Sequence, residues 1–223
     1  MTRTKLTDRK LPDYTRREEN INMISHIVGG AFGIFALVSC IIYAALHGDG
    51  YSMAGAIVFG VSTVLLYTIS SVYHGLRSET AKKILQIIDH CAVFVMVAGT
   101  YTPLMLCGLR RENATLAWIM FGLVCLVTIT GVVLNSIDLE MFHIFSIVCH
   151  LATGWMALAI IAPLSRAIGL TGVLLVVGGG VSYTVGSILY ALGGKKRYFH
   201  SIFHFFVIGG SVLQYLGIIL YTL

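Results

Sequence analysis

The sequence predicts an all-α integral membrane protein, a bundle of seven transmembrane helices with a cytoplasmic N-terminus and an external C-terminus. Of the 223 residues, 57% are hydrophobic and 11% are charged, and the mean hydropathy is +0.87. A soluble domain carries roughly 25% charged residues, so this chain lacks the polar surface that water requires. The apolar residues also form seven runs, each near the roughly 20 residues that a membrane-spanning helix needs.

The chain divides into a polar tail and one membrane domain. Residues 1–20 hold six Lys or Arg residues against four acids, and we expect a cytoplasmic tail that could lie along the membrane surface. Because the first apolar run is too long for a leader and lacks a cleavage site, we expect no signal peptide. Residues 21–223 form the predicted seven-transmembrane domain, with helices at about 21–46, 51–74, 84–107, 114–134, 141–164, 170–192 and 199–221.

The orientation follows from the Lys and Arg residues in alternate connections. With the N-terminus inside, the cytoplasmic segments hold 12 of the 15 basic residues: six in the tail, three between the second and third helices, and three between the sixth and seventh. The outer connections hold the other three, Arg110, Arg111 and Arg166. We therefore expect a multi-pass protein of the inner (cytoplasmic) membrane.

Composition also excludes some functions and bond types. The net charge of +5 does not indicate a nucleic-acid partner, because the basic residues lie in tails and short connections, without a stripe of aromatic residues between them. The five cysteines lie inside apolar runs without a CxxC spacing, so we expect small buried hydrophobes rather than disulfides or metal ligands.

Five polar residues stand out inside the apolar runs. Ser70 and His74 end the second predicted helix, Asp89 lies just over one turn into the third, and His200 and His204 begin the seventh. In the predicted orientation all three helix ends lie on the cytoplasmic side. Polar ionisable groups are costly in a membrane and are functional candidates there. Independent helix packing gives no reason for three distant segments to place such groups at one depth.

The residue types suit a catalytic metal site. His200 and His204 are spaced i, i+4, so their side chains share one face of a helix, as in the helical HExxH zinc motif, although no Glu lies between them here. His74 would supply a third imidazole, and three protein ligands are typical of a catalytic zinc ion. Asp89 could act as the general base for water, and Ser70 could hydrogen-bond to the water, to Asp89 or to a substrate carbonyl.

Each of these residues taken alone could have a purely structural role. A histidine at a helix end can lie at the membrane interface with one nitrogen in water, and Asp89 could instead pair with Lys82 or Lys83. Iron or manganese could replace zinc, although three imidazoles favour zinc. The remaining histidines of the helices could line a cavity, form a proton path or simply pack between helices, and these are His26, His90, His143 and His150.

At these residues the chain resembles a known family. The SxxxH of Ser70 and His74, the aspartate Asp89 with the segment 98–103 (AGTYTP) after it, and the HxxxH of His200 and His204 are similar to the hemolysin III branch of the progestin and adipoQ receptor family. The resemblance implies a zinc ion bound by the three histidines, with Asp89 on the zinc-bound water and Ser70 nearby. It also implies kinship with adiponectin receptors and alkaline ceramidases, and with lipid amide hydrolysis.

We therefore expect a zinc-dependent hydrolase of a membrane lipid amide, with an acyl chain bound in the cavity of the helix bundle. Two alternatives stay open. One is a lipid-sensing or membrane-homeostasis receptor in which the zinc is structural, and the other is a pore-forming, hemolytic protein. The helices show no repeated charged face, which argues against a pore.

Overall fold

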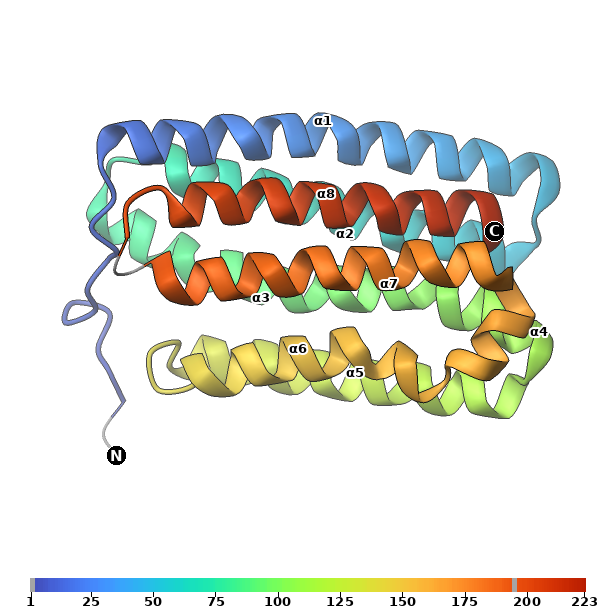
Figure 1. The fold of residues 1–223 in the computed structure, drawn as a ribbon. Coiled ribbons are helices and arrows are strands. Elements are labelled where there is room, and N and C mark those ends of the chain that lie inside the picture. The colour runs from blue at the N-terminus through green and yellow to red at the C-terminus, as the bar shows by residue number, and fades with distance from the viewer. Residues whose placement is uncertain (1–2, 194–195) are drawn as a thin grey trace.

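The fold is a bundle of long, antiparallel helices (Figure 1). A computed structural model describes residues 3–193 and 196–223, and within these ranges every regular element is helical. The elements are α1 (Arg16–His47), α2 (Gly50–Gly75), α3 (Glu79–Pro103), the π-helix η1 (Leu104–Leu109), α4 (Arg110–Glu112), α5 (Ala114–Ile137), α6 (His143–Ala159), α7 (Ile161–Gly193) and α8 (Phe199–Tyr221).

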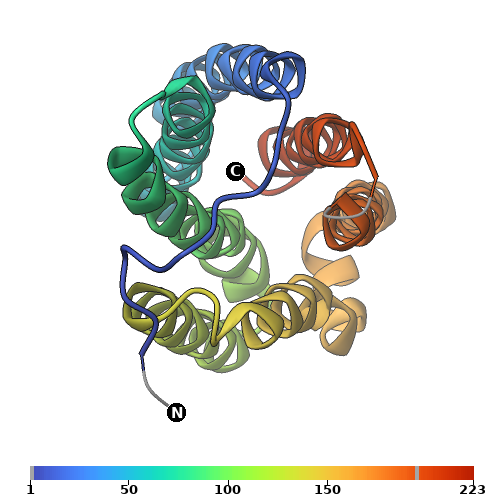
Figure 2. The same ribbon diagram turned by 90° about the vertical axis from the view of Figure 1, so that its left-hand side faces the viewer.

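The helices run alternately in opposite directions, so the two termini lie at opposite ends of the bundle (Figure 1). Seen from the end that carries the N-terminal tail, the helices form a ring, and the tail crosses the middle of it (Figure 2). In the described ranges six helical stretches are long and apolar enough to span a membrane, and α6, with 17 residues, is a shorter apolar helix. The chain is therefore a multi-pass membrane protein.

The outer surface of the bundle is apolar. α1 exposes large side chains along its whole length, among them Ile24 at 55%, Ile34 at 56% and Leu46 at 72%. α5 does the same with Ile119 and Ile129. A soluble monomer rarely leaves apolar patches of this extent in water, so these faces are suited to lipid.

The third predicted helix corresponds to a longer helical stretch, since α3, η1 and α4 together run over Glu79–Glu112. α3 begins at Glu79 rather than near residue 84, which places Asp89 ten residues, or about 15 Å, after the helix start instead of just over one turn. Pro103 does not end the helical stretch. Beyond Pro103 the helix continues as the π-helix η1.

The helix expected over 141–164 is interrupted. α6 ends at Ala159, Ile160 has non-helical dihedral angles, and α7 starts at Ile161. Pro163 lies in the first turn of α7, where its missing N–H costs no hydrogen bond. α7 itself bends at Gly169, whose φ of 72° is one that glycine adopts without strain.

Candidate metal centre

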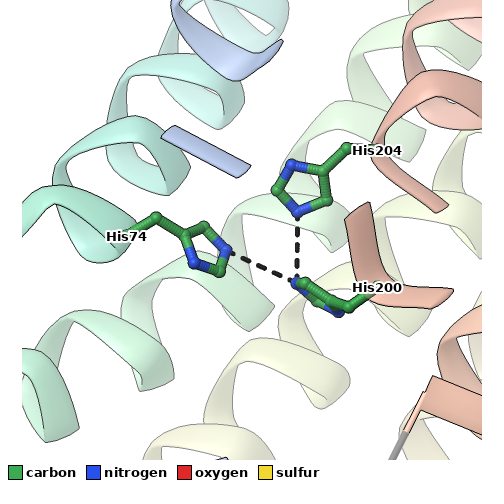
Figure 3. A group of neighbouring side chains, drawn as sticks. All are labelled: His74, His200 and His204. Atoms are coloured by element: carbon green, nitrogen blue, oxygen red, sulfur yellow. Dashed lines mark hydrogen bonds between the residues drawn. The ribbon is translucent and has the colours of Figure 1, made fainter. Parts of the chain in front are cut away.

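Three histidines from two helices face one another near the end of the bundle that carries the tail (Figure 3). His74 lies in the last turn of α2, and His200 and His204 lie in the first turns of α8. Their ring nitrogens offer three ligand atoms within 4.8 Å of one another, and none of the three residues is more than 9% exposed. The i, i+4 spacing places both α8 imidazoles on one face, directed at α2.

The distances suit a tetrahedral ion. Nε2 of His200 lies 3.4 Å from Nε2 of His74 and 3.1 Å from Nε2 of His204. Two ligands of a tetrahedral zinc site, each with a Zn–N bond of about 2.05 Å, are separated by about 3.3 Å. A ring nitrogen has one hydrogen or one lone pair in the ring plane, so His200 Nε2 cannot form good hydrogen bonds to both neighbours. These three histidines could therefore bind a metal ion.

The outer nitrogens of two of these rings are held by α1. Nδ1 of His74 lies 2.7 Å from Oε2 of Glu19, and a carboxylate can only accept, so this nitrogen carries the proton. Nδ1 of His204 lies 3.2 Å from Oγ of Ser25, whose own hydrogen is donated to the carbonyl of Asn22. Both contacts leave the lone pair on the inward Nε2, which is the tautomer that a metal ligand needs.

The start of α8 is fixed to the start of α1 through a second glutamate. Glu18 forms a capping box with Thr15, and its carboxylate also accepts hydrogen bonds from the backbone N–H of Tyr198 at 2.7 Å and from Arg197 at 3.2 Å. Tyr198 has a φ of 64°. This conformation is unfavourable for a residue with a side chain and persists only where the surroundings hold it. Glu18 therefore helps to set the position from which His200 projects.

Asp89 and Ser70 lie beside the histidines but not among them. Both line the same cavity as His200 and His204. The cavity has a volume of about 190 Å³. Asp89 is not one of the residues whose ligand atoms converge within 4.8 Å. The lysines that could have paired with it are engaged elsewhere, because Lys82 pairs with Glu19 and Lys83 pairs with Glu79.

The other helix histidines have different surroundings. His26 stacks on His204, with ring centroids 3.6 Å apart. His143 lies 3.4 Å from the hydroxyl of Tyr190. His150 packs on Phe94. All four of the histidines expected as possible cavity residues do line the cavity, namely His26, His90, His143 and His150.

Sequence reasoning missed the residues that support the site from the N-terminal side. The sequence predicts a polar tail over residues 1–20, but α1 begins at Arg16, so Glu18 and Glu19 belong to a helix. Thr15 followed by Glu18 is a capping-box pattern and could have shown this start. Nothing in the sequence indicated that residues 3–15 lie across the bundle end instead of along the membrane.

The sequence is similar to known proteins over most of its length. The model of the family described as Haemolysin-III related matches residues 14–215. The chain belongs to this haemolysin III family. It is 33% identical over 207 residues to Hemolysin-3 from Bacillus cereus, with 93% of each chain covered. It is 35% identical over 208 residues to the Hemolysin-3 homolog of Bacillus subtilis (strain 168), covering 93% of this chain and 96% of the relative.

A more distant relative is animal. The monocyte to macrophage differentiation factor of Homo sapiens is 22% identical over 190 residues, covering 82% of this chain and 76% of that protein. The region matched by the haemolysin III family model includes His74, Asp89, His200 and His204. The membership of the haemolysin III family that the sequence motifs indicated is thereby confirmed.

Proposed function

We propose that this haemolysin III protein is a zinc-dependent hydrolase that cleaves an amide bond of a membrane lipid. The observation that carries the proposal is the convergence of three imidazole Nε2 atoms beside a carboxylate at one end of an apolar cavity. His74, His200 and His204 would hold the metal. Asp89 and Ser70 would be the catalytic groups.

The donor set favours zinc over iron or manganese, because imidazole nitrogens suit zinc and the inward nitrogens already have tetrahedral spacing. When bound there, zinc supplies a Lewis acid that polarises a carbonyl and lowers the pKa of water. Asp89 receives the proton from the attacking water and returns it to the leaving amine. Ser70 holds the Asp89 carboxylate in place and can hydrogen-bond to the substrate carbonyl.

The extent and lining of the cavity support an acyl chain as the proposed ligand. It extends along α8 from His204 to Gln214, ten residues or about 15 Å along the helix axis. Its deeper wall is largely apolar, with Leu104 and Val176 among its side chains. A scissile amide beside the histidines would therefore leave room for a hydrocarbon chain directed toward the far end of the bundle.

The membrane arrangement is part of the proposal. The tail, the α2–α3 connection and the α7–α8 connection carry most of the Lys and Arg residues, and such residues remain on the cytoplasmic side. Seven passes, with α6 as the shortest, would place the C-terminus outside. The metal centre would then lie at the cytoplasmic end of the bundle in the inner membrane.

A lipid-binding receptor with a structural metal is the second candidate. It is favoured by the position of the three histidines, since a metal ion there would join α2 to α8 across more than a hundred residues of chain. A pore is less suited to the cavity, because Asp89 and most of the histidines lie toward one end of it. The word hemolysin in the names of the Bacillus relatives describes those proteins.

The test compares Asp89→Asn with the exposed control Asp8→Asn in a screen of ceramides and other N-acyl lipids. A hydrolase retains about one metal ion per chain in Asp89→Asn and loses turnover by at least ~100-fold, since general acid–base groups contribute about 10² to 10⁴. Asp8→Asn should behave as the wild type. Metal-loaded wild type that hydrolyses none of the N-acyl lipids, together with a mild Asp89→Asn phenotype, would favour the receptor.

A further inference from the structure

The N-terminal tail is fastened across the end of the bundle that holds the histidines (Figure 2). The backbone N–H of Thr4 donates to Oδ2 of Asp138 at 2.7 Å, in the connection between α5 and α6. The ammonium group of Lys83 on α3 donates to the carbonyl of Thr7 at 3.1 Å. The tail therefore spans from one side of the ring to the other.

Two arginines continue this attachment. Arg9 of the tail is only 5% exposed, and its guanidinium donates to Oε1 of Gln86 at 2.9 Å. Arg197, which precedes α8, donates to the carbonyl of Asp13 at 3.0 Å. The Nε atom of Arg9 lies 3.9 Å from a carboxylate oxygen of Glu140, so the guanidinium faces an acidic side chain as well as Gln86. These contacts fix the course of the chain directly before Tyr14.

Tyr14 is the residue that the fastened tail brings to the metal centre. Together with Pro12 it lines the cavity. Its ring stacks on the imidazole of His200, with centroids 4.9 Å apart and planes inclined by 25°, and lies 6.1 Å from the ring of His74. The phenol ring thus forms the wall of the site on the side of the tail.

His200 is the histidine that needs such a neighbour. His74 and His204 are oriented by hydrogen bonds from their Nδ1 atoms to Glu19 and Ser25. Within the part of the chain that the structure describes, Nδ1 of His200 is buried and has no hydrogen-bond partner. Ring orientation at a metal ligand is normally set by a bond at the outer nitrogen. His200 is instead surrounded by aromatic rings: Tyr14 stacks on it, and Phe203 and Tyr190 lie tilted at centroid distances of 5.4 and 5.7 Å.

We propose that Tyr14 is a positioning residue of the metal centre, which holds the imidazole of His200 by stacking and closes the site toward the water phase. The inference rests on the metal site of the proposed function and not on hydrolysis. It assigns the N-terminal tail to the site itself. Stacking requires the aromatic ring and not the hydroxyl group, so phenylalanine should replace tyrosine without loss.

The first measurement is the rate at which a chelator removes zinc from the loaded protein. Tyr14→Ala should release the metal about tenfold faster, the lower end of the effect expected for groups that orient metal ligands. Tyr14→Phe should match the wild type, as should Tyr221→Ala at the opposite end of the bundle. Arg9→Ala should also accelerate the release of zinc. Lys10→Ala, which changes the exposed neighbour of Arg9, should not.

The second measurement is the rate at which diethyl pyrocarbonate, a reagent for histidine, modifies His200 in metal-free protein. Peptide mass spectrometry monitors the carbethoxylation of His200 over time. His200 should react several-fold faster in Tyr14→Ala than in wild type or Tyr14→Phe. If Tyr14 protects His200 but the protein binds no metal, the proposed function is overturned, whereas the stacking of Tyr14 on His200 is supported. Zinc binding with equal release and equal carbethoxylation in wild type and Tyr14→Ala would overturn the role of Tyr14 and leave the proposed function standing.

Discussion

Nδ1 of His74 and Oε2 of Glu19 lie 2.7 Å apart, and the other oxygen of the same carboxylate binds Lys82. One side chain of α1 thus connects the last turn of α2 to the beginning of α3. The contact assigns the proton to the outer nitrogen of His74 and leaves the inner nitrogen free. A buried contact of this kind links the helix scaffold directly to the chemistry of the candidate metal centre.

Replacing Glu19 should therefore weaken metal binding without unfolding the chain. Partners of metal-bound histidines typically contribute about 10- to 100-fold in affinity, so Glu19→Gln should raise the zinc dissociation constant by about that factor in a competition titration with a chromophoric chelator. Glu79→Gln is the matched control, since Glu79 also lies in the first turn of a helix and pairs with a lysine. Equal affinities in the two variants would contradict the role of Glu19.

Helix packing can be tested at a glycine. A Cβ atom at Gly60 of α2 would lie 2.6 Å from Cα of Leu37 in α1, so the two helices would have to move apart. Gly60→Ala should lower the free energy of unfolding by about 1–3 kcal/mol, the range found for overpacked cores, and should lower the melting temperature in detergent. At Gly122 of α5 a Cβ would meet nothing within 4 Å, and Gly122→Ala should be neutral or stabilising.

The attachment of the tail should depend on pH through Asp138. Burial alone would raise the pKa of Asp138, but hydrogen bonds from the backbone N–H groups of Thr4 and Met141 outweigh it and hold the pKa below its usual value. Because the folded pKa is lower than the unfolded value of about 3.9, the stabilisation is complete above that pH and is lost as the pH falls through the folded pKa.

The corresponding experiment records melting temperature against pH for wild type, Asp138→Asn and the exposed control Asp8→Asn. The wild type should melt a few degrees above Asp138→Asn near neutral pH, and the difference should shrink as the pH falls below about 4. Asp8→Asn should follow the wild type throughout. A difference that stays constant down to the lowest pH would show that the charge of Asp138 does not hold the tail.

A pore would make a different prediction for liposomes. The deep wall of the cavity combines apolar side chains with uncharged polar ones, and its histidines lie mainly toward the tail end; the deep residues include Leu66, Met96, Leu104, Thr100 and Gln214. Among the described residues of this lining, Asp89 is the one acidic or basic residue besides the histidines, so an ion would meet no charged side chain deeper in the bundle. Reconstituted protein should therefore release entrapped dye no faster than liposomes with an unrelated helical membrane protein, and rapid release proportional to protein content would support the lytic alternative.

Much of this arrangement could be predicted from the sequence, because hydropathy and spacing act locally. The i, i+4 spacing of His200 and His204 determines that both lie on one helix face, and short connections bring α2 and α8 to the same end of the bundle. The family assignment followed from those same motifs. The position of Asp89 along its helix was harder to predict, because α3 starts earlier than its apolar run and Asp89 therefore lies further from the helix start than expected.

What could not be predicted depends on contacts between distant polar residues. Glu19, Ser25 and Tyr14 are ordinary residues for the start of a membrane helix, and only the folded chain shows that they touch histidines 55 to 186 residues away. The interruption at Ile160 could not be predicted either. Pro163 indicates a helix boundary, but it does not show whether one helix ends before it or the next helix has already begun. The candidate site therefore combines features that sequence spacing predicts with contacts that only the folded chain shows.

The most direct test of the metal centre is the metal content of detergent-purified protein, prepared without chelator and measured by elemental mass spectrometry for wild type and His204→Ala. We predict about one zinc per chain in the wild type and a loss of zinc in His204→Ala, with both proteins folded by circular dichroism. A well-folded wild type without stoichiometric metal would contradict the metal centre, and with it the proposed hydrolase.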